Sequence, residues 1–171
     1  MIITETYAII GKFREYIDYI EDHIKNVEKA FHEITDKCKD MRFVYDDFYY
    51  NILLNEVQKH DMSKFSTEEF TDYRRVFYPT NIETKPFSLE SAWSHHKENN
   101  SHHWENWTAK TLWKFPNEWE IHCAHMVIDW TAMGYKFGDT AQIYYEKNVD
   151  KIILPDYAID FMYEIFKRLT H

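Results

Sequence analysis

Residues that interrupt helices are scarce in this chain. It contains only three glycines and four prolines among 171 residues, while 44% of its residues are hydrophobic. So few breakers over this length favour long helices over a turn-rich β fold. A chain of this size is about one domain long and can bury a core without disulfides. We therefore predict a single all-α domain, a helical bundle that spans residues 1–171.

Apolar positions three and four residues apart locate the first helices. Residues 3–17 predict a short helix or a pair of turns that is weakest at Gly11, and residues 16–38 predict a longer helix with one clean apolar stripe. A further helix is predicted over residues 45–61. Its buried side is expected to consist of Tyr45, Phe48, Tyr49, Ile52 and Leu53.

Caps and breakers bound the later helices. Residues 66–69 have the Ser-x-x-Glu pattern of a capping box, which predicts that a helix starts there. Pro116 suits the first turn of a helix over residues 117–133, and Gly134 is expected to terminate that helix. Asp156 is expected to cap the last helix.

Charge and cysteine usage exclude several classes of function. The net charge of −9 argues against duplex nucleic acid as a partner, because affinity for it depends on basic residues that neutralise phosphates. A small phosphorylated ligand held by a few local cations is compatible with this charge. Cys38 and Cys123 form no CxxC pattern, no apolar run reaches the roughly 20 residues needed to cross a bilayer, and the N-terminus lacks the layout of a signal peptide. We therefore expect a reduced, cytoplasmic protein without a membrane partner.

Ten histidines are many for a chain of this length, and they point to metal chemistry. His60 and Asp61 are adjacent at the end of a predicted helix, so their side chains can approach one ion from different directions. His23 lies at the margin of an apolar stripe and Asp129 on the flank of another, whereas His32 is expected to face solvent. Two imidazoles and two carboxylates suit a divalent ion such as Mn, Fe, Co, Ni or Mg better than a structural zinc, and Zn stays on the list of candidates. The alternative is that these are ordinary core-edge histidines and capping aspartates.

Two His-His pairs, at residues 95–96 and 102–103, are seven residues apart. They would share a face if one helix continued through residues 99–100, where two asparagines make a break equally compatible with the sequence. We expect one member of each pair, His96 and His103, to bind a second metal or to contact a substrate phosphate. The alternative is that each pair has one inward histidine hydrogen-bonded in the core and one solvated histidine.

Three further side chains could assist an ion. His122 and His125 share a helix face with Asp129 and could orient its carboxylate, although the pattern favours solvated surface histidines. Lys64 lies one turn beyond the His-Asp pair and could supply a cation to a phosphate or to charge that develops in a transition state. The alternative for Lys64 is a solvated lysine or a salt bridge to Glu68.

These residues resemble the HD superfamily of metal-dependent phosphohydrolases. The run from His23 to Val27 is similar to the His-x-x-x-Val opening of that superfamily, His60-Asp61 to its name-giving pair, and Asp129 to its distal aspartate. More closely, four motifs within about residues 18–148 resemble a family of small HD-like proteins from phages and gut bacteria that has no established reaction. The motifs are His60-Asp61-x-Ser63-Lys64-Phe65, Ala92-Trp93-x-His95-His96, His102-His103-Trp104 and Asp129-Trp130-x-Ala132-Met133. His125 departs from this family, in which an acidic residue is expected.

The resemblance implies an HD-domain-like helical bundle with a central metal site. It implies a metal-dependent phosphohydrolase that acts on a small nucleotide or a related phosphate ester, with one or two divalent ions per chain. In such chemistry a cation lowers the pKa of bound water and polarises the phosphoryl oxygens. Asp61 would bridge two ions or orient the nucleophile, and Lys64 would stabilise developing charge. The implied ligands are His23, His60, Asp61 and Asp129, with His96 and His103 as auxiliary ligands or phosphate contacts.

Other functions fit the same residues. A non-catalytic protein could keep the bundle and bind a metal or a nucleotide, as a phage factor that sequesters a nucleotide signal or a host protein would. A metal-dependent oxygenase on a related His- and Asp-rich bundle is a weaker option. The assembly is also open between a monomer and a homodimer.

Overall fold

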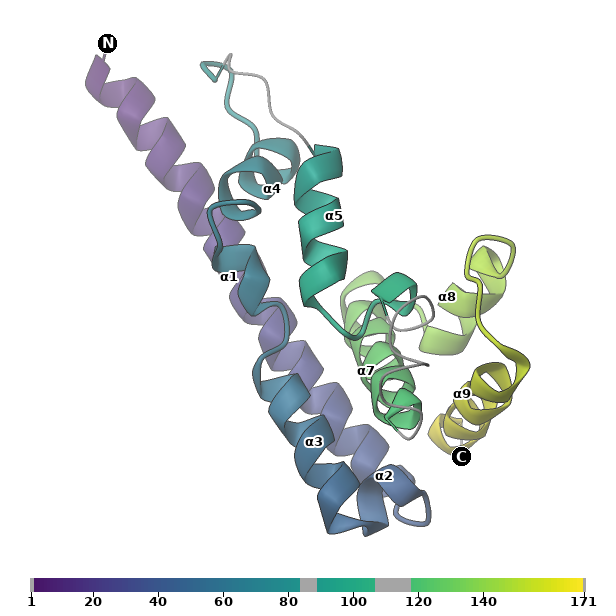
Figure 1. Cartoon of the computed structure of the whole chain (residues 1–171). Helices are drawn as coiled ribbons and strands as arrows, with labels where there is room; N and C mark the ends of the chain where they lie inside the picture. The colour runs from purple at the N-terminus through teal and green to yellow at the C-terminus, as the bar shows by residue number, and fades with distance from the viewer. Residues whose placement is uncertain (1, 84–88, 107–117, 171) are drawn as a thin grey trace.

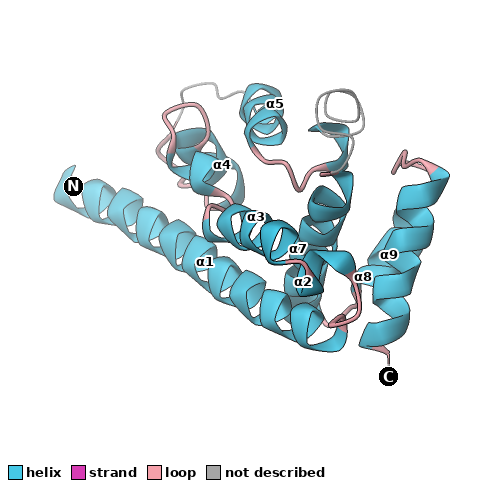
Figure 2. Ribbon diagram, turned by 60° about the horizontal axis from the view of Figure 1, so that its bottom comes forward, coloured by secondary structure: helices cyan, strands magenta, loops and turns pink. Residues whose placement is uncertain are grey.

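The computed structural model describes residues 2–83, 89–106 and 118–170. Within these ranges the regular elements are all helices, and loops and turns connect them (Figures 1 and 2). The prediction of an all-α fold is therefore confirmed. None of the described helices is both long and apolar enough to cross a membrane.

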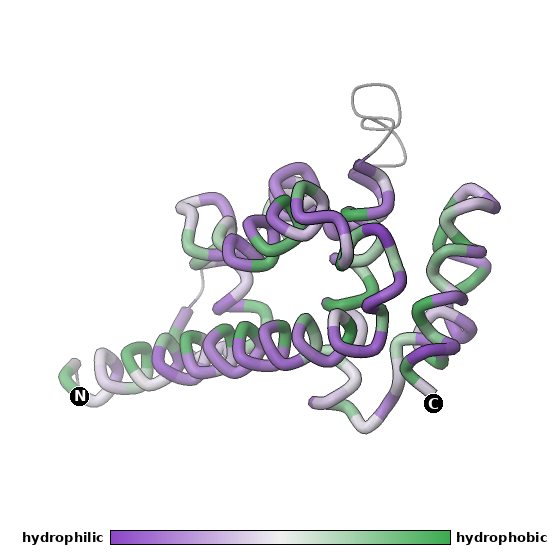
Figure 3. The backbone as a smooth tube through the Cα atoms, turned by 90° about the horizontal axis from the view of Figure 1, so that it is seen from below, coloured by the Kyte–Doolittle hydropathy of each residue, from purple (hydrophilic) through white to green (hydrophobic). Residues whose placement is uncertain are grey.

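The first helix, α1 (Ile2–Lys37), is a continuous rod of 36 residues along one side of the molecule (Figure 1). The prediction of a separate short helix or pair of turns over residues 3–17 was wrong, because one helix runs through Gly11. An isolated glycine destabilises a helix by only about 1 kcal/mol. The space beside Gly11 is open, since no described neighbour lies within 4 Å of the position that its Cβ would take. Hydrophilic and hydrophobic residues alternate along α1 with the helical turns (Figure 3). The buried residues of α1 face the bundle.

A short helix, α2 (Arg42–Tyr45), turns the chain back, and α3 (Asp47–Gln58) then runs beside α1 (Figure 1). The Asp46 side chain caps α3 by accepting a hydrogen bond from the Phe48 amide at 3.0 Å. Leu53 is fully buried, but Tyr45 and Phe48 are 64% and 65% exposed. The predicted buried side was therefore wrong at its first two positions, because Tyr45 belongs to α2 and Phe48 lies in the first turn of α3.

Beyond α3 the chain passes through a 3₁₀ turn, η1 (Met62–Phe65), into α4 (Phe70–Phe77) and α5 (Leu89–Asn99). The predicted capping box does not form, since α4 begins after Glu69 without a side-chain cap. Because α5 ends at Asn99, the second His-His pair lies in the turn that follows and not on the same helix.

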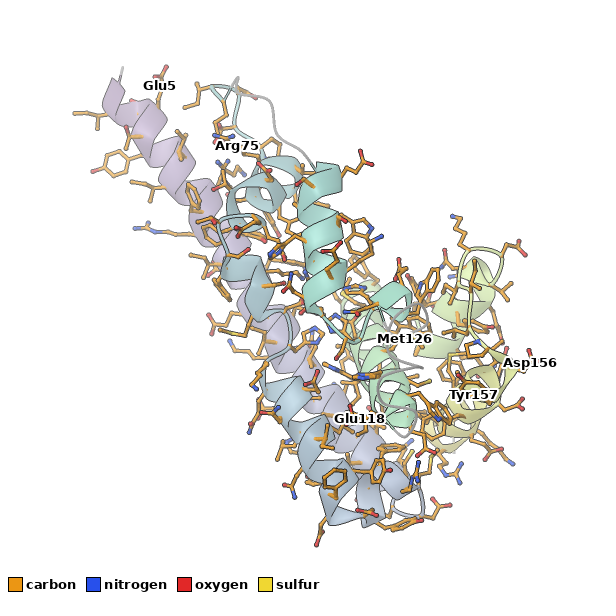
Figure 4. The ribbon with its side chains drawn as sticks, in the orientation of Figure 1. Glu5, Arg75, Glu118, Met126, Asp156 and Tyr157 are labelled. Carbon is orange, nitrogen blue, oxygen red and sulfur yellow. The ribbon has the colours of Figure 1, made fainter. Side chains whose placement is uncertain are left out.

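The central helix is α7 (Trp119–Phe137), which contacts α1, α2, α3, α8 and α9. It is buried almost all round over its first half, as a helix enclosed by other helices must be. Met126 points into the bundle from α7, whereas Glu5 lies near the free end of α1 (Figure 4). The predicted first turn at Pro116 lies outside the described residues.

Gly134 does not terminate α7 as predicted. The helix continues for one more turn and ends at Gly138, which has the left-handed φ of 72° that is common after a helix. The Gly134 carbonyl accepts hydrogen bonds from the amides of Gly138 and Asp139 at 2.9 and 3.2 Å. A Cβ on Gly134 would lie 2.5 Å from the Asp139 carbonyl oxygen. This glycine therefore serves a close backbone approach.

Two helices complete the fold. The Thr140 side chain caps α8 (Ala141–Asn148) by accepting from the Ile143 amide at 3.2 Å. Helix α9 (Asp156–Leu169) packs on α7, and its N-cap is Pro155, so the prediction of a cap at Asp156 was off by one residue.

The two helical glycines should respond in opposite ways to alanine. We expect Gly134→Ala to destabilise the protein by about 1–3 kcal/mol, because the new methyl group collides with backbone. Gly11→Ala should instead stabilise it by about 0.5–1 kcal/mol, because space is open and alanine favours the helix. Urea unfolding monitored by circular dichroism measures both, and equal effects would contradict this assignment of the glycines.

Candidate metal centre

Four of the predicted metal ligands meet where α1 and α7 face the turn after α3. His23 lies on α1, His60 and Asp61 lie in the turn between α3 and η1, and Asp129 lies on α7. His23, His60 and Asp61 are only 4%, 3% and 1% exposed. The structure thus brings together side chains that are up to 106 positions apart, since 129 − 23 = 106.

The four donor atoms have the spacing of ligands around one ion. His23 Nε2 lies 3.0 Å from His60 Nε2, 3.4 Å from Asp61 Oδ2 and 3.2 Å from Asp129 Oδ1. His60 Nε2 lies 3.4 and 3.6 Å from the same two oxygens. Ligand atoms at ~2.1 Å from one ion are ~3.0 Å apart at octahedral angles and ~3.4 Å apart at tetrahedral angles. His23, His60 and Asp129 can therefore hold a metal ion, and Asp61 Oδ2 lies close enough to both histidines to join them.

The backbone at this point is strained. Asp61 has a φ of 59°, the only positive φ of a non-glycine residue within the described ranges. Such strain costs on the order of 1 kcal/mol or more and gathers at functional sites. It directs the carboxylate of Asp61 inward, next to the imidazole of His60.

Opposite charges compensate for the burial of the two carboxylates. Burial alone would raise the pKa of Asp61, but the charges of His60 and Lys64 hold it well below its usual range. Burial would likewise raise the pKa of Asp129, yet a hydrogen bond with His23 brings it down to about 2. Burial would lower the pKa of His23, but hydrogen bonds to Asp129 and Asp61 raise it to about 9. A proton on His23 neutralises these carboxylates, and a divalent cation can do the same.

The second carboxylate oxygen of Asp61, Oδ1, faces another cluster of histidines. Asp61 Oδ1 is buried and accepts no hydrogen bond among the described residues, although His96 Nε2 and His102 Nε2 lie 3.3 and 3.6 Å away. The ligand nitrogens of His96, His102 and His103 lie within 4.8 Å of one another. The carboxylate of Asp61 therefore lies between two groups of potential metal ligands.

Glu69 is a site residue that sequence reasoning missed. It is fully buried, and its carboxylate contacts His95 Nδ1 at 2.6 Å and His96 Nδ1 at 2.8 Å. A carboxylate only accepts, so Nδ1 of His96 carries the proton and, in the neutral imidazole, the lone pair of Nε2 faces Asp61 Oδ1. A carboxylate behind a histidine in this way is typical of metal ligands. In the sequence, Glu69 was interpreted as part of a capping box and not as a partner of histidines.

His102 is the second residue that was missed, because His103 was chosen from its pair. His103 does join the cluster, with its ring centroid 4.8 Å from that of His96, but His102 is the one that approaches Asp61. Burial lowers the pKa of His102 well below its usual range, and burial also lowers the pKa of His103 to about 4. Both imidazoles are therefore neutral near pH 7, the form that binds metals.

His122 and His125 are buried, so the expectation that they are solvated was wrong. His125 Nε2 lies 3.0 Å from His60 Nδ1. The other ring nitrogen of His60, Nε2, is the one that faces Asp129. His125 contacts His60 and not the aspartate, and with His60 and His102 it forms a further group whose nitrogens could hold a metal ion. His122 belongs to none of the ligand groups found among the described residues, and the charge that acts on it is that of Glu56.

Lys64 contacts Asp61 and not Glu68. Its Nζ lies 2.5 Å from Asp61 Oδ2, and its side chain is only 14% exposed. Burial alone would lower the pKa of Lys64, but the charge of Asp61 outweighs it and raises the pKa, so the ammonium stays charged.

Several of the potential ligands line a cavity of about 960 Å³. They include His23, Asp61, His96 and Asp129. Much of the remaining wall is aromatic, with residues such as Tyr19, Trp93, Trp104 and Trp130. A small organic molecule can therefore reach the potential metal ligands.

The proton on His23 predicts a pH dependence of stability in metal-free protein. Because the folded-state pKa of about 9 lies above the usual 6.5, the stabilisation is complete below pH 6.5 and is lost as the pH rises through 9. We expect a loss on the order of 3 kcal/mol in unfolding free energy over this range. Urea unfolding of chelator-treated protein at pH 6.5 and 9 measures it.

His23→Gln should remove this loss, and His32→Gln, at an exposed position of the same helix, should keep it. A loss of the same size in the His23→Gln variant would contradict the assignment of the proton.

Comparison with known proteins extends over nearly the whole chain. A protein-family model described as a family of unknown function (DUF5662) matches residues 12–167. No curated protein and no solved structure matches the chain. The matched range includes every residue of the two ligand clusters, from His23 to Asp129. The chain therefore belongs to the DUF5662 family.

Proposed function

We propose that this protein is a metal-dependent phosphohydrolase whose two divalent ions share the Asp61 carboxylate. The observation that carries the proposal is the position of its two oxygens. Oδ2 faces His23 and His60 at 3.4 Å, and Oδ1 faces His96 and His102 at 3.3 and 3.6 Å. The His/Asp clusters are compatible with Mn, Fe, Co, Ni, Mg or Zn, and the lack of thiolates disfavours a structural zinc site.

Electrostatic balance supports an ion on the Oδ1 side of Asp61. A buried carboxylate is costly unless cations or hydrogen-bond donors satisfy both oxygens. Lys64 and two imidazoles satisfy Oδ2, whereas the neutral His102 and the Nδ1-protonated His96 direct no hydrogen bond to Oδ1. A cation between Oδ1 and these two imidazoles would satisfy all three groups.

Divalent ions at this place would lower the pKa of bound water and polarise phosphoryl oxygens, which is the chemistry of phosphate-ester hydrolysis. The chain's own residues would do the rest. Glu69 holds His96 by its Nδ1 proton, and His125 contacts His60 Nδ1, so both imidazoles keep a fixed direction. Lys64 adds a positive charge beside Asp61 that would stabilise negative charge on a substrate in the cavity. The substrate would be a small phosphate ester, and nucleotides are among the first candidates.

Removal of the charge on the shared carboxylate should weaken metal binding and strongly reduce hydrolysis. We expect dialysed wild-type protein incubated with Mn²⁺ to retain up to about two ions per chain. Asp61→Asn should retain fewer and should lose hydrolysis by about 100-fold or more. Asparagine tolerates the left-handed backbone, so the fold should survive. Metal analysis by mass spectrometry and phosphate release from a panel of mono- and diesters are the measurements.

The outcomes separate the functions. Protein that takes up no divalent metal would contradict the proposed centre. Bound metal with identical background rates in wild type and Asp61→Asn would instead indicate a metal-binding protein without hydrolase activity.

Glu69 offers a second test, with a neighbour as its matched control. We expect Glu69→Gln to weaken metal binding about 10–100-fold, because an amide holds His96 less firmly than a carboxylate does. Glu68→Gln, at the adjacent exposed position, should leave it unchanged. Competition with a chromogenic chelator measures the affinity. Equal affinities in the two variants would show that Glu69 only packs and pairs in the core.

A further inference from the structure

Four isoleucines of α1 recur every seven residues, and all of them are exposed. They are Ile3, Ile10, Ile17 and Ile24, which are 71%, 38%, 42% and 36% exposed. We refer to them as the isoleucine stripe. Apolar residues that recur every seven positions over three intervals are typical of a helix that packs lengthwise against another helix. At 1.5 Å per residue the stripe is about 32 Å long.

The bundle uses a different face of α1. Ile20, Val27 and Ile34 also recur every seven residues, and these three are buried. Ile20 and Val27 each lie three residues after a member of the isoleucine stripe, so the two apolar rows run side by side along the helix. In a coiled coil both such rows contact the partner helix. In this protein the buried row packs inside the bundle, and the isoleucine stripe remains available to a further helix.

The N-terminal end of α1 has even less support. The first turns of this helix project away from the other helices (Figures 1 and 3), and residues 3–8 are all exposed. Tyr7, one turn after Ile3, is 68% exposed and widens the apolar surface. A helix without tertiary contacts is only marginally stable in water, and contiguous exposed apolar side chains mark a contact surface. A partner along the isoleucine stripe would support this end of the helix.

A second copy of the chain offers a helix that fits the stripe. Its α1 has the same length and the same repeat of seven. Because the spacing is equal, a twofold axis can place each isoleucine of one copy against an isoleucine of the other, which is the arrangement of most homodimers. Among the described helices, no other has two exposed large hydrophobic residues seven positions apart. The stripe therefore has its best match in another α1.

The charges beside the stripe allow two copies to meet there. With a net charge of −9, two chains repel each other. The charged residues that border the stripe on its solvent side lie one or four positions after its members, and they are Arg14, Asp18, Glu21, Lys25 and Glu28. Two are basic and three are acidic, so they contribute a net charge of only −1. Glu21 already pairs with Lys25 at 2.7 Å. Repulsion along this face is therefore small.

We propose that α1 packs lengthwise against the α1 of a second copy through the isoleucine stripe, so that the protein is a homodimer. The stripe does not line the cavity, and His23, which precedes Ile24, points into the bundle and is 4% exposed. Dimer formation therefore leaves the candidate metal centre open to small molecules. The proposal does not depend on the phosphohydrolase function.

Analytical ultracentrifugation of chelator-treated protein tests the dimer, because chelation removes any association that metal ions bridge. We expect wild-type protein at micromolar concentration to have twice the 21.0 kDa mass of one chain. A variant with both Ile10→Lys and Ile17→Lys should dimerise about 100-fold or more weakly, because its dimer would bury lysines in place of isoleucines.

The matched control carries Ile143→Lys and Ile153→Lys. Both positions are exposed, at 41% and 72%, and they lie outside the stripe, on α8 and before α9. Each double variant gains two lysines, so both have a net charge of −7 in place of −9. Both should fold, because the replaced side chains are exposed. The control should dimerise as wild type does.

Hydrogen exchange measured by mass spectrometry locates the interface. The amides of residues 6–12 lie in the projecting part of α1 and should be protected when wild-type protein is dimeric. They should lose this protection on dilution to the monomer, and also in the variant with Ile10→Lys and Ile17→Lys. The amides of α8, which carries no part of the stripe, should exchange alike in wild type and in this variant.

The outcomes decide between this interface and its alternatives. Loss of the dimer and of the protection in the stripe variant alone would support the proposal. Wild-type protein that stays monomeric at high micromolar concentration would overturn it. A dimer that withstands the two lysines in the stripe, or that dissociates equally in the control, would overturn it as well. None of these results bears on the metal centre, which metal uptake tests separately.

Discussion

Burial of the Asp61 carboxylate is the constraint on which the rest of the site depends. A carboxylate that is only 1% exposed must be surrounded by positive charge or by donors, because transfer of an isolated ion out of water is very costly. Helix α1 contributes His23, α5 contributes His96, and the turn after α5 contributes His102. The left-handed backbone of Asp61 itself turns the carboxylate toward them. The bundle is thus organised around one negative group.

The packing of α7 fixes the other side of the centre. This helix is enclosed by its neighbours, so its position and rotation are set by close-packed side chains and by the backbone contact at Gly134. Asp129 and His125 both lie on it, one at the ligand cluster and the other behind His60. The central helix therefore determines the spacing of the potential ligands in the first cluster. The second cluster depends on α5 and the turn after it, which pack on η1 and on the buried Glu69.

Helical phase explains what could be predicted from the sequence and what could not. The apolar stripes of α1 and α7 set the direction of His23 and Asp129, so the sequence indicated that both could reach the core. Glu69 escaped notice because its spacing from Ser66 fits a helix cap, and only tertiary structure shows that its partners are two histidines 26 and 27 positions away. His102 lies beyond the end of α5, where helical periodicity no longer gives a direction. The role of Gly134 likewise depends on a backbone segment that passes close to it. Local pattern predicts local structure, and contacts between distant segments decide the rest.

An anomalous-scattering map from crystals of the protein grown with Mn²⁺ would test most directly whether ions bind on both sides of Asp61. We predict one peak within about 2.0–2.3 Å of Asp61 Oδ2 and of the imidazoles of His23 and His60, and a second peak at similar distances from Asp61 Oδ1, His96 and His102. Peaks confined to exposed positions such as His32, or no peak beside Asp61, would contradict it.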